Sequence, residues 1–159
     1  MYAVKNFAIE SDFYDYQKAL SRENNNRARE WVVKSLPYTM HRDVPYLLAD
    51  EILHPFFTSD PLFAESVITA LGKYMDLEFI SDKIVTVIRD DQDDLVILSA
   101  INNLIQPNTF YNQRKINDLL FLGYNSSKNM HIKLQIGMYL INQFSPLEVQ
   151  TIYNIIKTY

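Results

Sequence analysis

One stretch of the chain, residues 60–106, reads DPLFAESVITALGKYMDLEFISDKIVTVIRDDQDDLVILSAINNLIQ. Apolar residues recur in it every three or four positions over 61–74, over 77–89 and again from Leu95. This spacing predicts three amphipathic helices in succession. A short break at Met75 and Asp76 separates the first two, and an acidic run precedes the third. Two helices joined by a short turn form a hairpin, and a second hairpin that begins almost at once indicates a helical repeat.

Capping residues and prolines predict helices before this stretch. The amides at 24–26 are suited to start a helix over 27–36, because short polar side chains satisfy the free N–H groups of a first turn. Asp43, followed by a proline in the first turn, predicts a helix over 44–53. We expect His54 to lie at the end of that helix as a cation that favours its dipole.

Further helices are predicted after it. Thr109 is expected to cap a helix over 110–122, and Gly123 to end that helix in the left-handed conformation. The remaining predicted helices cover 13–21, 128–143 and 147–157, and 56–59 is expected to be a connector. We expect Trp31, Leu53 and Phe121 to face the core, and Arg29 to lie among the solvated basic residues.

Four segments share an apolar pattern at a nearly constant spacing. Residues 67–71 lie 35 positions after 32–36, residues 100–104 lie 33 further on, and 136–140 another 36. A period of 33 to 36 with two helices per unit is typical of a solenoid. The predicted pairs are 27–36 with 44–53, 61–74 with 77–89, 95–106 with 110–122, and 128–143 with 146–157. An irregular bundle of four pairs is the alternative.

The composition fits one all-α domain over residues 1–159. Apolar residues make up 48% of the chain, charged residues 21%, and only three glycines occur. The absence of cysteine excludes disulfides and thiolate chemistry. No signal peptide is recognisable at the N-terminus, and no apolar run reaches the ~20 residues that span a bilayer. We therefore expect a cytoplasmic protein without a membrane partner.

Charge is distributed unevenly along the chain. The net charge is −4, but residues 43–94 hold 12 Asp and Glu against 3 Lys and Arg, while both flanks are mildly positive. Such a field repels nucleic acid and attracts a basic partner. The candidate partner-binding residues are the carboxylates and tyrosines in or beside this segment, namely Asp60, Asp76, Glu78, Asp82, Asp90, Asp91, Asp93, Asp94, Tyr38, Tyr46 and Tyr74.

A purely structural interpretation competes with this one. Asp93 and Asp94 are placed to cap the next helix, and each tyrosine is able to pack over a helix joint with its hydroxyl in water. For the acidic run 90–94 as a whole the two interpretations stay open.

No catalytic signature is present. Glu51 and His54 have the i, i+3 spacing of helical metal sites, but such sites need a second pair and further carboxylates. Phosphate loops and serine elbows are absent. We expect no metal, no cofactor and no enzymatic activity.

The central stretch resembles the HEAT and HEAT-like repeat families. The resemblance rests on Asp60-Pro61, on Ala70-Leu71-Gly72 in a first helix and on the acidic turn at 90–94, and it covers about one repeat and a half. It implies a HEAT-like α-α superhelix of about four helical hairpins plus an N-terminal helix. Repeat motifs specify a fold and leave the activity open.

In size, charge and expected fold the chain also resembles the immunity proteins of bacterial polymorphic or contact-dependent toxin systems. That resemblance implies a non-enzymatic module that neutralises a basic, nuclease-type toxin domain through an acidic, tyrosine-bearing surface, as a monomer or weak homodimer. One alternative is a scaffold or adaptor that binds a peptide or helix in its groove. A more remote alternative is a HEAT-like enzyme acting on nucleic acid.

Overall fold

A computed structural model describes residues 10–90 and 93–143 of the chain. All regular secondary structure in these residues is helical, which confirms the predicted all-α class. The chain divides into two compact units, residues 1–111 and residues 112–159. No helix among the described residues is both long and apolar enough to cross a membrane.

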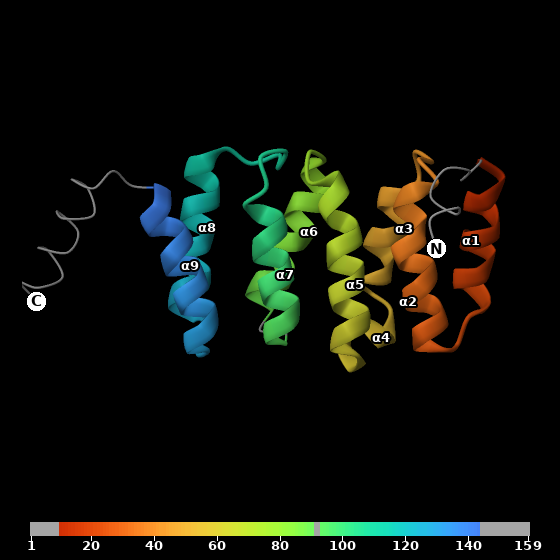
Figure 1. Cartoon of the computed structure of the whole chain (residues 1–159), viewed down its shortest axis with the longest axis horizontal. Coiled ribbons are helices and arrows are strands. Elements are labelled where there is room, and N and C mark those ends of the chain that lie inside the picture. Colours follow the sequence, from red (N-terminus) through yellow and green to blue (C-terminus); the bar gives the residue numbers. More distant parts are fainter. Residues whose placement is uncertain (1–9, 91–92, 144–159) are drawn as a thin grey trace, which may run out of the picture. The chain divides into compact units, whose positions relative to one another are not determined.

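The helices of the first unit agree with the sequence pattern to within a few residues (Figure 1). They are α1 (Glu10–Arg22), α2 (Asn26–Ser35), the 3-10 turn η2 (Leu36–Tyr38), α3 (Val44–Glu51), α4 (Pro55–Ser59), α5 (Pro61–Leu71), the 3-10 turn η3 (Gly72–Tyr74), α6 (Glu78–Arg89) and α7 (Asp94–Leu104). The short helix α4 occupies residues for which only a connector was expected, so that prediction was wrong.

Helices α2, α5 and α7 form one row of the first unit. Helix α5 contacts α2 on one side and α7 on the other, and all three begin at the same edge, which is the lower edge in Figure 1. Helices α3 and α6 contact each other and pack against this row, α3 on α5 and α6 on α7. We refer to α2, α5 and α7 as the first row, and to α3 and α6 as the second row.

Burial in the first row repeats with the predicted spacing. Val33, Ile68 and Ile101 are buried at equivalent positions, 35 and 33 residues apart. The caps Asn25, Asp60 and Asp93 have the same two spacings, and each accepts hydrogen bonds from backbone N–H groups of the helix it precedes. The other buried sets in this register are Val32, Val67 and Ala100, and Leu36, Leu71 and Leu104.

A buried ion pair joins α1, α2 and α3. Arg29 donates from Nε to Glu51 Oε2 at 2.6 Å and from Nη2 to Glu51 Oε1 at 2.7 Å, and Nη1 donates to the carbonyl oxygen of Leu20 at the end of α1. Both side chains are almost fully buried. The expectation that Arg29 is solvated was wrong, because Glu51 satisfies the guanidinium inside the protein.

A close approach between α5 and α7 involves Gly72. Asn103 is buried and donates from Nδ2 to the carbonyl oxygen of Ile68 at 2.5 Å, while its Oδ1 accepts from Gln106. A Cβ atom on Gly72 would lie 2.5 Å from Asn103 Oδ1. Gly72, the last residue of the Ala-Leu-Gly segment, is therefore required because a side chain would not fit there. Its φ of −55° is ordinary for a helix, so backbone conformation does not require glycine.

The second unit contains two described helices, α8 (Gln113–Ser126) and α9 (Met130–Gln143), which pack against each other. Their buried apolar side chains are Ile116, Leu119 and Leu120 on α8 and Ile132, Ile136 and Leu140 on α9. The expected helix at 147–157 lies outside the described residues.

Predicted helix ends in the second half of the chain need two corrections. Asn112, and not Thr109, caps α8, since its side chain accepts from the N–H of Lys115. Gly123 lies inside α8, and none of the described glycines has a positive φ. The helix continues through Gly123 to Ser126, so this glycine does not end it.

Three large residues expected in the core are exposed. Trp31 is 58% exposed, Leu53 75% and Phe121 45%. Trp31 and Phe121 each directly adjoin a buried apolar residue in the sequence. Apolar periodicity alone assigned all three side chains to the wrong face.

Candidate functional site

The candidate binding residues divide between two opposite edges of the first unit. Asp60, Asp90, Asp93 and Asp94 lie where α5 and α7 begin and α6 ends (Figure 1). Asp91 lies outside the described residues. Tyr38, Tyr74, Asp76 and Glu78 lie at the other edge, where η2 and η3 end and α6 begins. Helix α6 has 12 residues, so the edges are separated by about 18 Å.

This division follows from the hairpin geometry. Successive turns of a helical hairpin alternate between the two ends of the helices, so residues near in sequence are placed far apart. Asp82 lies one turn into α6, between the edges, and Tyr46 lies in the first turn of α3. The acidic segment is therefore a face with two ends and not one compact cluster.

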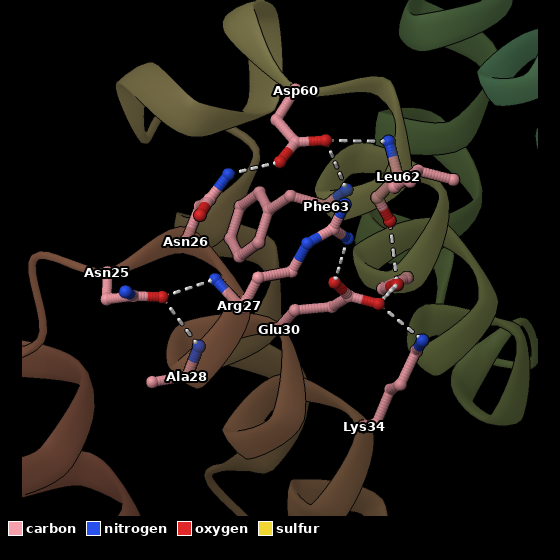
Figure 2. Close-up of polar contacts among 10 residues, drawn as sticks. Asn25, Asn26, Arg27, Ala28, Glu30, Lys34, Asp60, Leu62 and Phe63 are labelled. Carbon is pink, nitrogen blue, oxygen red and sulfur yellow. Dashed lines mark hydrogen bonds and ion pairs between the residues drawn. The ribbon is translucent and has the colours of Figure 1, made fainter.

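Two carboxylates at the first edge, Asp60 and Asp93, cap helix starts. Asp60 Oδ1 accepts from the N–H of Leu62 at 3.0 Å and of Phe63 at 3.3 Å, and Asp60 Oδ2 accepts from Asn26 of α2 (Figure 2). Asp93 accepts from the N–H of Leu95 at 2.9 Å. These contacts are those of N-caps, and a negative charge there is also favoured by the helix dipole.

A second polar group joins α2 to α5 beside Asp60. The Glu30 carboxylate forms ion pairs with Arg27 Nη1 at 2.8 Å and with Lys34 Nζ at 2.6 Å (Figure 2). The hydroxyl of Ser66 on α5 donates to the same carboxylate at 3.2 Å. Partial burial alone would raise the pKa of Glu30, but the hydrogen bonds from Lys34 and Arg27 outweigh it and lower that pKa. Two cations of the first row thus share one carboxylate.

Each predicted tyrosine makes contacts within the protein. The ammonium of Lys73 lies 3.8 Å from the centre of the Tyr38 ring. Tyr74 is half-buried, and this burial raises the pKa of its hydroxyl. Tyr46 stacks on Phe79 of α6, with the ring centres 4.8 Å apart and the planes 9° from parallel. Of these three tyrosines, Tyr46 bridges the two helices of the second row.

A groove runs between α6 and residues 52–58, which follow α3 and include most of α4, and which we call the α3–α4 segment. Its volume is about 480 Å³, within the ordinary range of ligand sites. Apolar side chains and polar side chains both line it. The apolar ones are Ile52, Leu53, Phe57, Phe79 and Val87, and the polar ones are Thr58, Asp82, Lys83, Thr86 and Asp90.

Two of the predicted carboxylates, Asp82 and Asp90, are brought to this groove. Tyr111 donates its hydroxyl to Asp82 Oδ1, and burial together with the charge of Asp82 raises the pKa of Tyr111 to about 12. The phenol therefore stays protonated at neutral pH and orients the carboxylate. Asp90, which directly follows the last residue of α6, is exposed.

Sequence reasoning missed most of the groove. Phe79, Lys83, Thr86 and Asp90 have the spacing of one helical stripe, and that stripe was available from the sequence. The opposite wall of the groove could not be predicted, because α4 was expected to be a connector and Leu53 to be buried.

Glu51 and His54, which have the spacing of a helical metal site, are both engaged by other groups of the protein. Glu51 uses both carboxylate oxygens on Arg29, and His54 Nδ1 accepts from the N–H of Phe56 as the N-cap of α4. The expectation of a cationic His54 at a helix end was wrong, since burial lowers its pKa, as does the charge of Arg29. No group of three or more His, Asp or Glu in the described ranges is placed to hold a metal ion.

No protein-family model matches the chain, and neither does any curated protein or solved structure. The function must therefore be argued from the groove and the charges around it.

Proposed function

We propose that the protein is a non-enzymatic binding module for a basic protein partner, which it engages through the second-row face of its first unit. Tight occlusion of such a partner is what an immunity protein of a bacterial toxin system does, and we propose this as the biological setting. The partner is then a basic, nuclease-type toxin domain.

The observation that carries this proposal is the unbalanced charge of the second row. Helices α3 and α6 contain only two cations, Lys83 and Arg89. In and directly beside these helices lie five exposed carboxylates, namely Asp43, Asp50, Glu78, Asp82 and Asp90, and only one further cation, Arg42, which lies 3.7 Å from Asp43. The first row differs, because its acidic Glu30 is matched by Arg27 and Lys34.

Electrostatic steering gives this face a mechanism. A surface of one charge sign raises the rate at which an oppositely charged protein docks, and the gain falls steeply as salt screens the charges. Apolar and aromatic groups inside the contact then lower the dissociation rate. The groove and the stacked pair Tyr46 and Phe79 supply such groups on the same face.

A HEAT-like superhelix is the architecture we propose for the first unit. The 35- and 33-residue spacing of both caps and buried positions supports it, as does the stacking of α5 between α2 and α7. The enzyme alternative requires inward carboxylates without partners. Glu51 is the one buried carboxylate among the described residues, and it is bound by Arg29.

The experiment uses the purified chain as bait for proteins of its host at low and at high salt. The expected result is a basic protein that is retained at low salt and released at high salt. Its association rate should then be measured against the double variant Asp50→Asn, Glu78→Gln, which removes two exposed charges of the face without changing side-chain size. We expect a slower association and a weaker salt dependence.

The matched control is Asp15→Asn, Glu65→Gln, which changes the net charge equally on α1 and on the first-row helix α5. This variant should associate at a rate close to that of the unmodified protein. Equal rates for the two double variants, or a retained partner that is acidic and resistant to salt, would overturn the proposal.

A further inference from the structure

We propose that the groove between α6 and the α3–α4 segment receives one amphipathic α-helix of the basic partner. This inference rests on the proposed function and names the structural element that is bound. The occupant presents two basic residues about two helical turns apart, with apolar residues between them on the same face.

The apolar side of the groove is open to receive side chains. Phe57 and Val87 are buried beneath it, Ile52 and Phe79 are partly exposed, and Leu53 is 75% exposed. An exposed leucine beside a partly apolar hollow gains burial when another protein covers it. We therefore assign Leu53 as a residue that contacts the bound helix, because its exposed side chain contributes little to the stability of the fold.

The carboxylates that line the groove define the spacing of the partner's charges. Asp82 and Asp90 lie eight residues apart on α6, a separation of about 12 Å along the helix axis. Lys83 also lines the groove and would repel a basic side chain placed near it. A basic partner is therefore attracted to Asp90 and to the carboxylate of Asp82, which Tyr111 orients. A Lys or Arg at each end of the bound segment matches this arrangement.

A helix suits the groove better than an extended segment does. The walls are helices, whose backbone N–H and C=O groups are already paired internally. An extended peptide buried against them would leave its own backbone groups without partners, which costs free energy. A helix satisfies its backbone by itself and presents residues seven or eight apart on one face, at the required ~12 Å.

The first test uses two synthetic 18-residue helical peptides of identical composition. In one, two lysines lie seven positions apart with two leucines between them on the same face. In the other, the lysines are moved to the opposite face. We expect the first peptide to bind at least about tenfold more tightly by calorimetry, since only it joins charge and apolar contacts. Equal affinities would overturn the inference.

The second test places single substitutions in the protein. Asp82→Asn and Asp90→Asn should each weaken binding of the first peptide about twofold to fivefold, as exposed ion pairs usually do. Leu53→Ala should weaken it about tenfold, because an apolar anchor is lost. The asparagine at 82 still accepts from Tyr111, and Leu53 is too exposed for its truncation to unfold the chain.

Controls of the same kind lie elsewhere in the first unit. Asp15→Asn removes an equal charge from α1, and Leu62→Ala shortens a leucine exposed on the first-row helix α5. Both should bind the peptide like the unmodified protein. If the groove variants behave like these controls, the inference fails.

The two proposals fail in different ways. A basic host protein that binds with the expected salt dependence, but equally well to Leu53→Ala and Asp90→Asn, refutes the groove and leaves the acidic face standing. Loss of peptide binding in the groove variants, with no basic partner retained from the host, supports the groove and refutes the proposed function.

Discussion

Gly72 and Asn103 fit together so closely that a Cβ on the glycine would lie 2.5 Å from the amide oxygen of the asparagine. The asparagine is held in place from two directions, because it donates to the Ile68 carbonyl oxygen and accepts from Gln106. The pair joins the end of α5 to α7, in the core of the first unit.

Gly72→Ala should therefore destabilise the protein, by about 1–3 kcal/mol, the usual cost of overpacking a core. The measurement is the free energy of unfolding in urea. In an Asn103→Ala background the same substitution should cost much less, because the obstructing amide is gone. Additive effects of the two substitutions would show that the contact does not limit packing at Gly72.

The buried pair of Arg29 and Glu51 predicts an asymmetric response. Arg29→Met leaves the Glu51 carboxylate without its partner and should cost about 3–5 kcal/mol of unfolding free energy. Adding Glu51→Leu to Arg29→Met should recover much of that loss. Arg27→Gln, in the exposed pair with Glu30, is the control and should cost far less than Arg29→Met, because solvent screens an exposed ion pair. A double variant no more stable than Arg29→Met would contradict this account.

His54 predicts a pH dependence of stability. Its folded pKa is lowered from the ordinary 6.5 by burial and then by Arg29, with Glu51 acting in the opposite direction. Above pH 6.5 both the folded and the unfolded chain carry neutral histidine, so its contribution to stability is complete. As the pH falls below 6.5 the unfolded chain binds the proton first, and stability declines toward the folded pKa.

The test compares urea midpoints at pH 7.5 and pH 5.5. His54→Asn keeps a side-chain acceptor for the N–H of Phe56 but does not titrate, so its stability should fall less between the two pH values. His131→Asn, at an exposed position of the second unit, should fall as much as the unmodified protein does. An unchanged decline in His54→Asn would assign the pH dependence to other groups.

Trp31 is the only tryptophan of the chain, and its exposure is directly measurable. We expect fluorescence typical of a solvent-exposed indole and efficient quenching by acrylamide in the folded protein. Trp31→Ala should change the unfolding free energy by less than about 1 kcal/mol. Leu36→Ala, at a fully buried position of η2, should cost about 2–5 kcal/mol. Emission that shifts strongly to the red on unfolding would instead place Trp31 in the core.

The helix caps and the buried positions of the first row could be predicted from the sequence, because each depends on residues within its own helix. The caps Asn25, Asp60 and Asp93 and the buried residues Val33, Ile68 and Ile101 recur at one spacing, and each is explained by its own helix. Their positions therefore followed from cap chemistry and apolar periodicity.

The errors arise where a residue depends on a partner far away in sequence. Arg29 is buried because Glu51, 22 positions later, receives it. Apolar periodicity could not tell that Trp31 would be left exposed. The candidate carboxylates were expected on one surface, and their division between two edges follows from the lengths of α5 and α6. Whether those residues bind a partner stays a prediction.

The joints between neighbouring first-row helices carry different polar contacts. Between α2 and α5 they are Asn26 with Asp60 and Ser66 with Glu30, and between α5 and α7 they are made by Asn103. Buried apolar residues recur at equivalent positions along the three helices and so do not by themselves distinguish the two joints. Helices of a repeated array are liable to dock on the wrong neighbour during folding. A wrongly docked helix here would leave the Asn103 amide and the Asn26 amide without their partners, so these polar contacts favour the native order of the helices.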